Sequence, residues 1–343
     1  MARIIESFPT RFRAVIVGFV GTVIACGNAV APTMQASVVT GSRIRVQTVP
    51  RPMVRAGEVL VKLRYAAVNP ADWKRASGAP EDPQIGKPRD ERVPIPGLDG
   101  SGVIVELGAG VTGFKVGDAV LLWSRHAGTY AQYVAVSSED VALKPPAVSF
   151  AQAAAIPHAA LAAWNLLVEV AKVRAGQTVL VLGGAGGVGS AAVQIARLQG
   201  ARVVATASGR NADYLRKIGA DTVIDYTMAH FEEQVRGVDV ALNAVDADNA
   251  YRGLAVVKRG GYLVSVAGLP AASQCASRGI ICAARTAAPA AAGATLERLA
   301  AWTQTGRFTV NIDRSFEITE VLQAWRYSQA GHTRGKIAIR IAE

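Results

Sequence analysis

The sequence predicts an α/β protein, in which a small β-rich domain precedes a doubly wound parallel sheet with helices on both faces. Residues 34–150 contain short alternating stretches separated by turn residues, a pattern typical of β structure. From residue 151 onward, apolar strand-like runs alternate with helix-like segments, as in a parallel sheet with crossover helices. A glycine-rich turn at 183–189 joins one of these strands to the helix that follows.

The first 33 residues differ from the rest of the chain. Arg3, Arg11 and Arg13 precede an uncharged apolar run that ends at Cys26, which is the layout of a secretory signal. Residues 23–26 resemble a lipobox, in which the cysteine thiol accepts a lipid. The run of about 13 residues is too short to span a bilayer. The alternative is an over-extended start, with the true chain beginning at Met34.

These two interpretations give different locations for the protein. A chain that starts at Met34 is expected in the cytoplasm, whereas a cleaved signal would export it or anchor it through Cys26. A membrane is therefore an expected partner only if Cys26 is lipidated.

The β-rich part is expected to contain four strands, because strand-forming residues alternate there between glycines and other turn residues. These strands are placed at 35–40, 59–65, 102–107 and 119–123. Residues 79–97 hold five prolines and several charges, which predicts a long surface loop.

The second part begins with an alanine-rich helical stretch at 151–169. The helix after the glycine turn is amphipathic, with apolar residues at 188, 191, 192, 195 and 198 on one face. Strands are expected at 178–182, 202–206, 222–225, 238–244 and 262–267.

Composition excludes several classes of protein but does not show which molecule the positively charged chain binds. Of the 343 residues, 50% are hydrophobic and 18% are charged, which excludes an intrinsically disordered chain. Three cysteines exclude a disulfide-stapled scaffold and a zinc site built from four thiolates. The formal net charge of +11 is compatible with a nucleic acid, an anionic membrane or an anionic cofactor.

The glycine turn has the pattern of a dinucleotide-binding cradle. Its residues are Gly184, Ala185, Gly186, Gly187, Val188 and Gly189, directly after a strand and at the start of a helix. The three spaced glycines permit a tight turn, close approach of a pyrophosphate and close packing of helix on strand. The helix N-terminus offers N–H groups and a positive dipole end to the phosphates. The alternative is a glycine turn with a purely structural role.

The end of the next strand favours NADP(H) over NAD(H). An NAD site usually has an acidic side chain there, to accept a hydrogen bond from the ribose 2′-hydroxyl. This chain has Ser208 and Arg210 instead, and a guanidinium suits a 2′-phosphate. The alternative is that Arg210 is a solvated surface charge.

An ordered set of motifs resembles the medium-chain dehydrogenase/reductase superfamily, in particular its zinc-free quinone oxidoreductase branch. The resemblance covers residues 34–343, and its motifs lie at 59–62, 69–74, 96–102, 114–118, 153–157, 183–189, 217–221, 260–261 and 331–336. It implies a GroES-like catalytic domain at 34–157, completed by 308–343, and a Rossmann NADP-binding domain at 158–307. Residues 1–33 are then an extension.

The resemblance also implies roles for single residues. Tyr226 follows the third strand, where relatives use an aromatic ring beside the 2′-phosphate or adenine. Asn243, Val245 and Ala267 correspond to segments that border the nicotinamide.

The resemblance also implies two candidates for catalysis. Asn69 is expected to donate a hydrogen bond to polar groups of the ligand. Lys74 stands where some quinone reductases carry a tyrosine, and it is expected either to donate a proton or to be an ordinary exposed lysine.

No metal site is expected. Zinc-dependent relatives have a His–Glu pair after Pro-Gly, where this chain has Leu98 and Asp99, and no cysteine lies between residues 34 and 274. The four histidines show no metal-ligand spacing, and Cys275 and Cys282 are expected to be buried apolar residues.

The expected function is therefore zinc-independent hydride transfer from NADPH to quinones or α,β-unsaturated carbonyls, since a conjugated acceptor needs less electrophilic help than a simple ketone. The alternative is a non-catalytic NADP(H)-binding or sensor protein, because Ala162 stands where many relatives have a threonine and because no residue is a firm proton donor. The expected partners are a small-molecule substrate and, as an option, a second copy of the chain in a homodimer. Nucleic acid is not expected, because the sequence contains no DNA-binding motif.

Overall fold

The computed structural model describes residues 32–41, 43–78, 87–285 and 292–342. The predicted signal with its lipobox at Cys26 lies outside these residues, as do residues 79–86 of the predicted proline-rich loop. Within the described ranges, no helix is both long enough and apolar enough to cross a membrane.

A six-stranded parallel sheet forms the part of the chain that contains the glycine cradle. Its order is β10-β9-β8-β11-β12-β13, so the direction of strand succession reverses between β8 and β11. The strands are β8 (Thr178–Leu182), β9 (Arg202–Ala207), β10 (Thr222–Asp225), β11 (Val238–Asn243), β12 (Val257–Ser265) and β13 (Ile281–Ala284).

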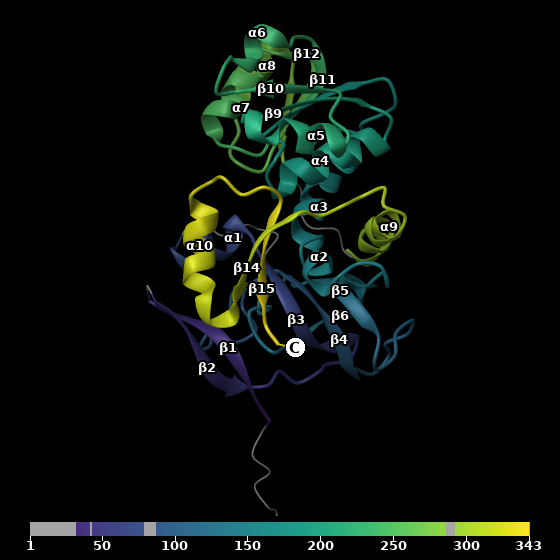
Figure 1. The fold of residues 1–343 in the computed structure, drawn as a ribbon, viewed down its shortest axis with the longest axis vertical. Helices are drawn as coiled ribbons and strands as arrows, with labels where there is room; N and C mark the ends of the chain where they lie inside the picture. Colours follow the sequence, from purple (N-terminus) through teal and green to yellow (C-terminus); the bar gives the residue numbers. More distant parts are fainter. Residues whose placement is uncertain (1–31, 42, 79–86, 286–291, 343) are drawn as a thin grey trace, which may run out of the picture. The chain divides into compact units, whose positions relative to one another are not determined.

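Helices cover both faces of this sheet, which confirms the predicted doubly wound arrangement (Figure 1). They are α4 (Gly187–Leu198), α5 (Ala212–Lys217), α6 (Phe231–Gln234), α7 (Ala247–Gly253) and α8 (Ala272–Arg278), with the 3₁₀ turn η3 (Gly209–Asn211). Alternate residues of β8 point to opposite faces, because side chains alternate along a strand. Val179 and Val181 belong to one buried cluster, and Leu180 and Leu182 belong to another.

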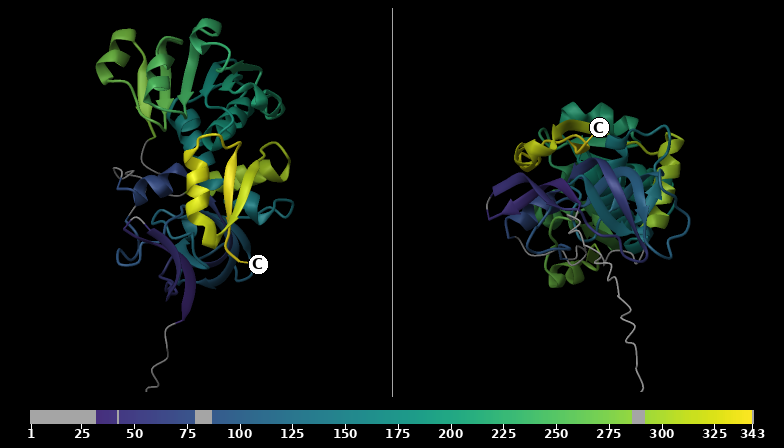
Figure 2. Two further views of the ribbon diagram at one scale, coloured as in Figure 1. Left: turned by 60° about the vertical axis from the view of Figure 1, so that its left-hand side comes forward. Right: turned by 90° about the horizontal axis from the view of Figure 1, so that it is seen from below.

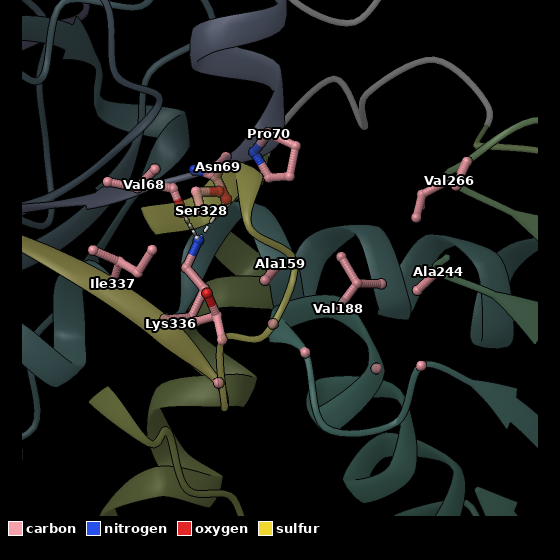
Figure 3. A pocket seen from close by; sticks show the side chains of 18 of the residues that line it. Val68, Asn69, Pro70, Ala159, Val188, Ala244, Val266, Ser328, Lys336 and Ile337 are labelled. Atoms are coloured by element: carbon pink, nitrogen blue, oxygen red, sulfur yellow. Dashed lines mark hydrogen bonds between the residues drawn. The ribbon is translucent and has the colours of Figure 1, made fainter. Parts of the chain in front are cut away.

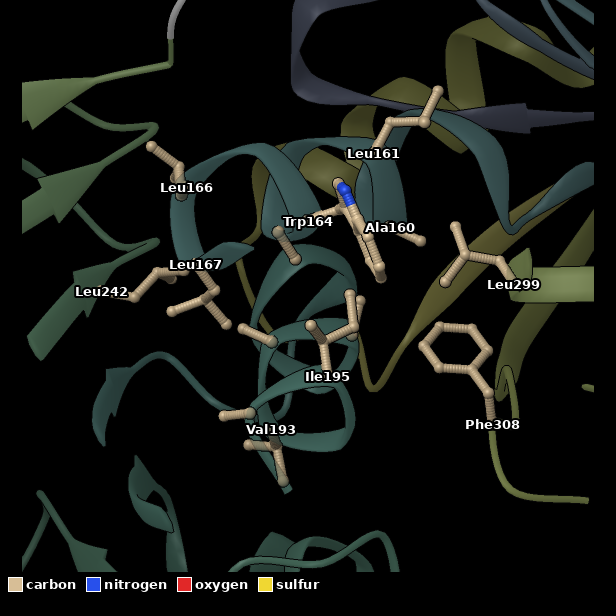
Figure 4. Close-up of a cluster of buried hydrophobic side chains, with 14 of the residues drawn as sticks. Ala160, Leu161, Trp164, Leu166, Leu167, Val193, Ile195, Leu242, Leu299 and Phe308 are labelled. Carbon is tan, nitrogen blue, oxygen red and sulfur yellow. The ribbon is translucent and has the colours of Figure 1, made fainter. Parts of the chain in front are cut away.

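The first of these clusters connects the sheet to the helices that precede β8. Trp164 and Leu167, from α3 (Pro157–Trp164) and the π-helix η2 (Asn165–Val170), pack with Ile195 of α4 (Figure 4). Leu299 of α9 (Gly293–Gln304) and Phe308 complete the contact. The helical stretch predicted at 151–169 is therefore two short helices, α2 (Phe150–Ala154) and α3, followed by the π-helix.

A seven-stranded sheet forms the β-rich part of the chain. Its path is β14-β15-β3-β4-β5-β7, and β6 pairs separately with β3. The strands are β3 (Glu58–Val68), β4 (Asp99–Leu107), β5 (Ala119–Trp123), β6 (Tyr133–Ser137), β7 (Val141–Leu143), β14 (Ile312–Glu317) and β15 (Lys336–Arg340). The hairpin of β1 (Thr33–Thr40) and β2 (Arg43–Pro50) forms a separate two-stranded sheet.

The closing strand β15 joins this sheet from the far end of the sequence. It runs antiparallel to β3, with Ile337 opposite Val68 and Arg340 opposite Tyr65. Figure 2 shows β14 and β15, in yellow, side by side with α10 (Val321–Gln329). The remaining elements are α1 (Pro70–Ala76) and the 3₁₀ turns η1 (Ser138–Asp140) and η4 (Ile318–Glu320).

Cys275 is buried in an apolar cluster, as predicted, whereas Cys282 is only partly buried beside it. The prediction did not include the disulfide that joins the two residues between α8 and β13. Their Cα atoms are 6.0 Å apart, which is within the usual range for a disulfide. Helix α8 ends at Gly279 in the left-handed conformation, with φ at 64°, and the chain turns back there. This turn brings the edge strand alongside the helix, so residues seven positions apart meet.

The turn between β8 and α4 leaves no room for a side chain at its last glycine. A Cβ atom on Gly189 would lie 2.1 Å from the carbonyl oxygen of Gly183, whereas the nearest atom to a Cβ on Gly186 is 3.6 Å away. Packing therefore requires a glycine at position 189 but not at position 186.

We therefore expect Gly189→Ala to destabilise the protein by about 1–3 kcal/mol, the usual cost of overpacking. Gly186→Ala is the matched control and should change the free energy of unfolding by less than about 0.5 kcal/mol. Urea unfolding of both variants measures the difference. Equal midpoints for the two variants would contradict the packing argument.

Candidate active site

A cavity of about 250 Å³ lies at the carboxyl ends of β8, β11 and β12 (Figure 3). Doubly wound sheets bind ligands at this point, where the order of strands reverses. The opposite wall comes from the end of β3, the start of α1 and the start of β15. The lining residues are Val68, Asn69, Pro70, Lys74, Ala159, Gly183, Gly186, Gly187, Val188, Gly189, Ala244, Val245, Val266, Ala267, Ser328, Gly331, Thr333, Gly335, Lys336 and Ile337.

The glycine cradle supplies one wall of this cavity. Helix α4 starts after Gly186, which has no side chain to cap the first turn. The N–H groups in the first turn of a helix have no partner within the helix, and the helix dipole places positive charge there. Gly187, Val188 and Gly189, which carry three of these groups, line the cavity. The wall can therefore hold an anionic group such as a pyrophosphate.

The cradle is bonded directly to the start of β15. Gly335 donates from its backbone nitrogen to the carbonyl oxygen of Ala185 at 2.8 Å. Gly335 has φ of +80°, and a Cβ atom there would lie 2.3 Å from the carbonyl oxygen of Asn311. The next residue, Lys336, packs its side chain on the cradle, since a Cβ atom on Gly187 would be 2.8 Å from Lys336 Cδ.

Asn69 lies at the end of β3, and its side-chain amide is held by two partners. Its Nδ2 donates to Asp99 Oδ2 at 2.9 Å, and its Oδ1 accepts a hydrogen bond from Lys336 Nζ. Lys336 Nζ also donates to the carbonyl oxygen of Val68 at 3.0 Å and to Asp99 Oδ2 at 3.3 Å. None of the described residues accepts the second Nδ2–H of Asn69. A hydrogen-bond donor therefore remains for a ligand.

A second buried carboxyl group supports the backbone of Asn69. Asp72 Oδ2 accepts hydrogen bonds from the Asn69 backbone nitrogen and the Tyr130 hydroxyl, both at 2.8 Å. Burial raises the pKa of Asp72 to about 7. Burial also raises the pKa of Asp99, although the nearby Lys336 ammonium acts against this rise. The buried imidazole of His158 has a pKa well below its usual value, because burial disfavours the charged ring.

Eight of the predicted site residues line the cavity. They are Asn69, Lys74, Gly186, Gly187, Val188, Gly189, Val245 and Ala267. Lys74 is exposed at the rim on α1, and its Nζ lies 5.6 Å from the centre of the Trp73 ring.

Three further predicted residues lie behind the cavity wall. A Cβ atom on Gly184 would approach the Ala205 side chain to 2.9 Å, and the carbonyl of Ala185 accepts the bond from Gly335. Asn243 is fully buried, where its Nδ2 donates to the Ser265 hydroxyl at 3.0 Å and its Oδ1 accepts from the Val245 backbone nitrogen at 3.2 Å. Asn243 therefore shapes the loop that carries Val245.

Ser208, Arg210 and Tyr226 lie outside the cavity lining, after β9 and β10. Arg210 is exposed, and the Tyr226 side chain is also largely in solvent, with 56% of the residue exposed. Arg334 joins this group, since its guanidinium donates to Asn211 Oδ1 at 2.7 Å and to the Arg210 carbonyl at 3.0 Å. Arg334, which precedes β15, thus binds the backbone of the loop after β9 that carries Arg210.

Sequence reasoning did not assign roles to Lys336, Asp99 and Arg334. The Gly335-Lys336 pair was visible as part of a motif, but its partner Asn69 is 267 residues away. No local spacing could connect the two. One feature of the sequence could have indicated a role for Lys336. The residue opens an apolar strand, and a charge buried there requires a partner of opposite charge or a hydrogen-bond acceptor.

We expect the raised pKa of Asp72 to affect stability. The folded-state pKa of about 7 exceeds the ordinary value of 3.8, so the folded protein binds this proton more tightly than the unfolded chain. The associated stabilisation is complete below about pH 4 and is lost as the pH rises through 7. Asp72→Asn keeps an oxygen acceptor but cannot titrate.

The free energy of unfolding of the wild type, relative to Asp72→Asn, should fall by roughly 2–4 kcal/mol between pH 4.5 and pH 7.5. Urea titrations of both proteins at a series of pH values measure this difference. A difference that does not vary with pH would contradict the shift.

The residues at the position of the zinc ligands in zinc-dependent relatives do not fit a zinc ion. Leu98 is apolar and buried, and the Asp99 carboxylate is engaged by Asn69, Lys336 and the backbone nitrogen of His158. Among the described residues, no three His, Cys, Asp or Glu side chains are grouped so that they could hold a metal ion.

Two family models match the chain. The model described as alcohol dehydrogenase GroES-like domain matches residues 55–146, and the model described as zinc-binding dehydrogenase matches residues 218–339. A solved structure of a quinone oxidoreductase from Coxiella burnetii is similar to this chain, with a TM-score of 0.80 and 28% sequence identity. The similarity covers 91% of this chain and 100% of that one.

Two plant proteins are similar in sequence. The 2-methylene-furan-3-one reductase of Solanum lycopersicum is 35% identical over 301 residues, covering 84% of this chain and 73% of the relative. The chloroplastic NADPH-dependent alkenal/one oxidoreductase of Arabidopsis thaliana is 34% identical over 302 residues, with the same coverage. With the parallel sheet and its cradle, these matches establish that the chain belongs to the medium-chain dehydrogenase/reductase superfamily, as an NAD(P)H-dependent oxidoreductase.

Proposed function

We propose that the protein transfers hydride from NADPH to quinones or α,β-unsaturated carbonyls without using zinc. The observation that carries this proposal is the Asn69 amide, which lines the cavity with one donor N–H left for a ligand. The names of the relatives support the substrate class, since they refer to a methylene-furanone, to alkenals or alkenones and to quinones.

The chain offers a place for each part of the cofactor. The first turn of α4 would hold the pyrophosphate, and the loops at Val245 and Ala267 would border the nicotinamide. Ser208, Arg210, Arg334 and Tyr226 would surround an adenosine 2′-phosphate, with the two guanidiniums supplying charge-assisted hydrogen bonds. In this proposal residues 158–307 bind most of the cofactor, and residues 34–157 with 308–343 bind the substrate and add Arg334 at the 2′-phosphate.

When bound, NADPH supplies the hydride, which adds to the electron-poor carbon of the acceptor. Negative charge then develops on the carbonyl oxygen of the substrate. The free Nδ2–H of Asn69 donates a hydrogen bond to this oxygen, and a donor fixed in advance stabilises the charge without reorganisation. Val68, Val188 and Ile337 form apolar walls that exclude water, while Lys74 at the rim is placed to supply the proton.

The alternative of a non-catalytic NADP(H)-binding protein has two supports, Ala162 and the lack of a firm proton donor in the sequence. Ala162 is buried in α3, and it is not among the residues that line the cavity. The residue of α3 that lines the cavity is Ala159, one turn earlier.

We expect Asn69→Ala to lower kcat by about 10²–10³-fold, the usual effect of removing one donor to a developing oxyanion. NADPH oxidation is measured with a panel of enones and quinones, and with saturated ketones as a comparison. Binding of NADPH, followed by fluorescence, should change little.

Two results would count against the proposal. One is tight NADPH binding by the wild type without turnover of any acceptor, which would favour the sensor. The other is faster reduction of saturated ketones than of enones.

We expect Arg210→Glu to lower the preference for NADPH over NADH by at least about tenfold, because a carboxylate repels the 2′-phosphate. Lys217→Glu is the matched control, since it makes the same charge change on an exposed side chain of α5, the helix that follows Arg210. The ratio of kcat/KM for the two cofactors is the measurement. An unchanged ratio in the Arg210 variant would remove Arg210 from the site.

A further inference from the structure

We infer that Lys336 and Asp99 are positioning residues that hold the Asn69 amide in the orientation needed for donation. The inference rests on the proposed function of Asn69. Lys336 is buried, with 6% of its side chain exposed, and it pairs with a carboxylate that has no exposure at all. Neither charge can be solvated by bulk water, so each depends on the contacts around it.

The hydrogen bonds of Lys336 are all in use. An ammonium group has three N–H donors and no acceptor. These donors meet the Val68 carbonyl, the Asn69 Oδ1 and the Asp99 Oδ2. Lys336 therefore has no further proton to give to a substrate without breaking one of these bonds, and its effect on the reaction passes through Asn69.

The two charges leave Asn69 one stable orientation. In the observed state, the amide oxygen faces the ammonium and the amide nitrogen faces the carboxylate. A flip of the amide would place NH₂ against the ammonium and the oxygen against the carboxylate, and both contacts would be repulsive. The pair therefore keeps a donor, rather than an acceptor, available to the cavity.

The same lysine also forms part of the cradle. Its stem packs on Gly187 at the start of α4, and the preceding Gly335 bonds to Ala185. Lys336 thus contacts the wall that would hold the cofactor and the amide that would face the substrate. One side chain sets the position of both.

The test removes both charges together, because removal of one would leave the other buried and unpaired. In the full-length protein, the double variant Lys336→Met with Asp99→Asn is made both alone and together with Asn69→Ala. The control is Lys258→Met with Asp239→Asn, which removes an ion pair at β11 and β12 that contributes no residue to the cavity lining.

In the steady-state assay, we expect the Lys336/Asp99 double variant to lose about 10²-fold in kcat, with NADPH affinity within about threefold of the wild type. Adding Asn69→Ala to this variant should then cost less than about threefold, since residues that act as a unit are not additive. The control pair should keep wild-type kcat and the full effect of Asn69→Ala. Additive losses would overturn the inference.

A second readout does not require turnover. The Asn69 Nδ2 protons are observed by ¹⁵N NMR, assigned by their loss in Asn69→Ala. We expect their exchange with solvent to be at least tenfold faster in the Lys336/Asp99 variant than in the wild type and in the control. Unchanged exchange would overturn the inference even if the wild type reduces enones. Faster exchange in a wild type that reduces no acceptor would uphold the positioning and refute only the proposed function.

Discussion

The antiparallel pairing of β15 with β3 is the contact on which the cavity depends. It brings Lys336 beside Asn69 and places Gly335 against the glycine cradle. The wall that carries the donor amide and the wall that carries the helix N-terminus are therefore held by one short stretch of chain. A displacement of this strand would change both walls at once.

The polar cluster under Asn69 lowers the stability of the folded state, because Asp72, Asp99 and Lys336 are all buried and have lost their hydration. Its cost is limited by mutual hydrogen bonds, which include the bond from Tyr130 to Asp72. Among the described residues, Asp72 Oδ1 and His158 Nδ1 still have no partner. An apolar core of the same volume would avoid these costs, but it would not orient an amide.

Local features of the fold were predictable, whereas contacts between distant segments were not. The cradle was evident because strand, glycines and amphipathic helix are consecutive, and β5, β8 and β10 have the predicted bounds. Strands β2, β6, β7, β13 and β14 were not predicted. Polar and apolar residues do alternate at the start of β2, but several side chains of β2 and β14 are exposed, so neither strand has a clear buried face. The roles of Lys336 and Arg334 depend on where a distant part of the chain returns, which no residue spacing records. The Cys275–Cys282 bond is local, but it depends on the turn at Gly279 that brings β13 back beside α8.

The way β15 completes the seven-stranded sheet has a consequence for the order in which the molecule is made. Strand β3 leaves the ribosome long before β15. Its first half can pair with β6 early, but the edge at residues 65–68, which pairs with β15, stays open while the entire six-stranded sheet is synthesised. An open strand edge is a template for intermolecular pairing. The assembly of the site is therefore a late, high-contact-order event, in which the nascent chain must protect this edge until synthesis is nearly finished.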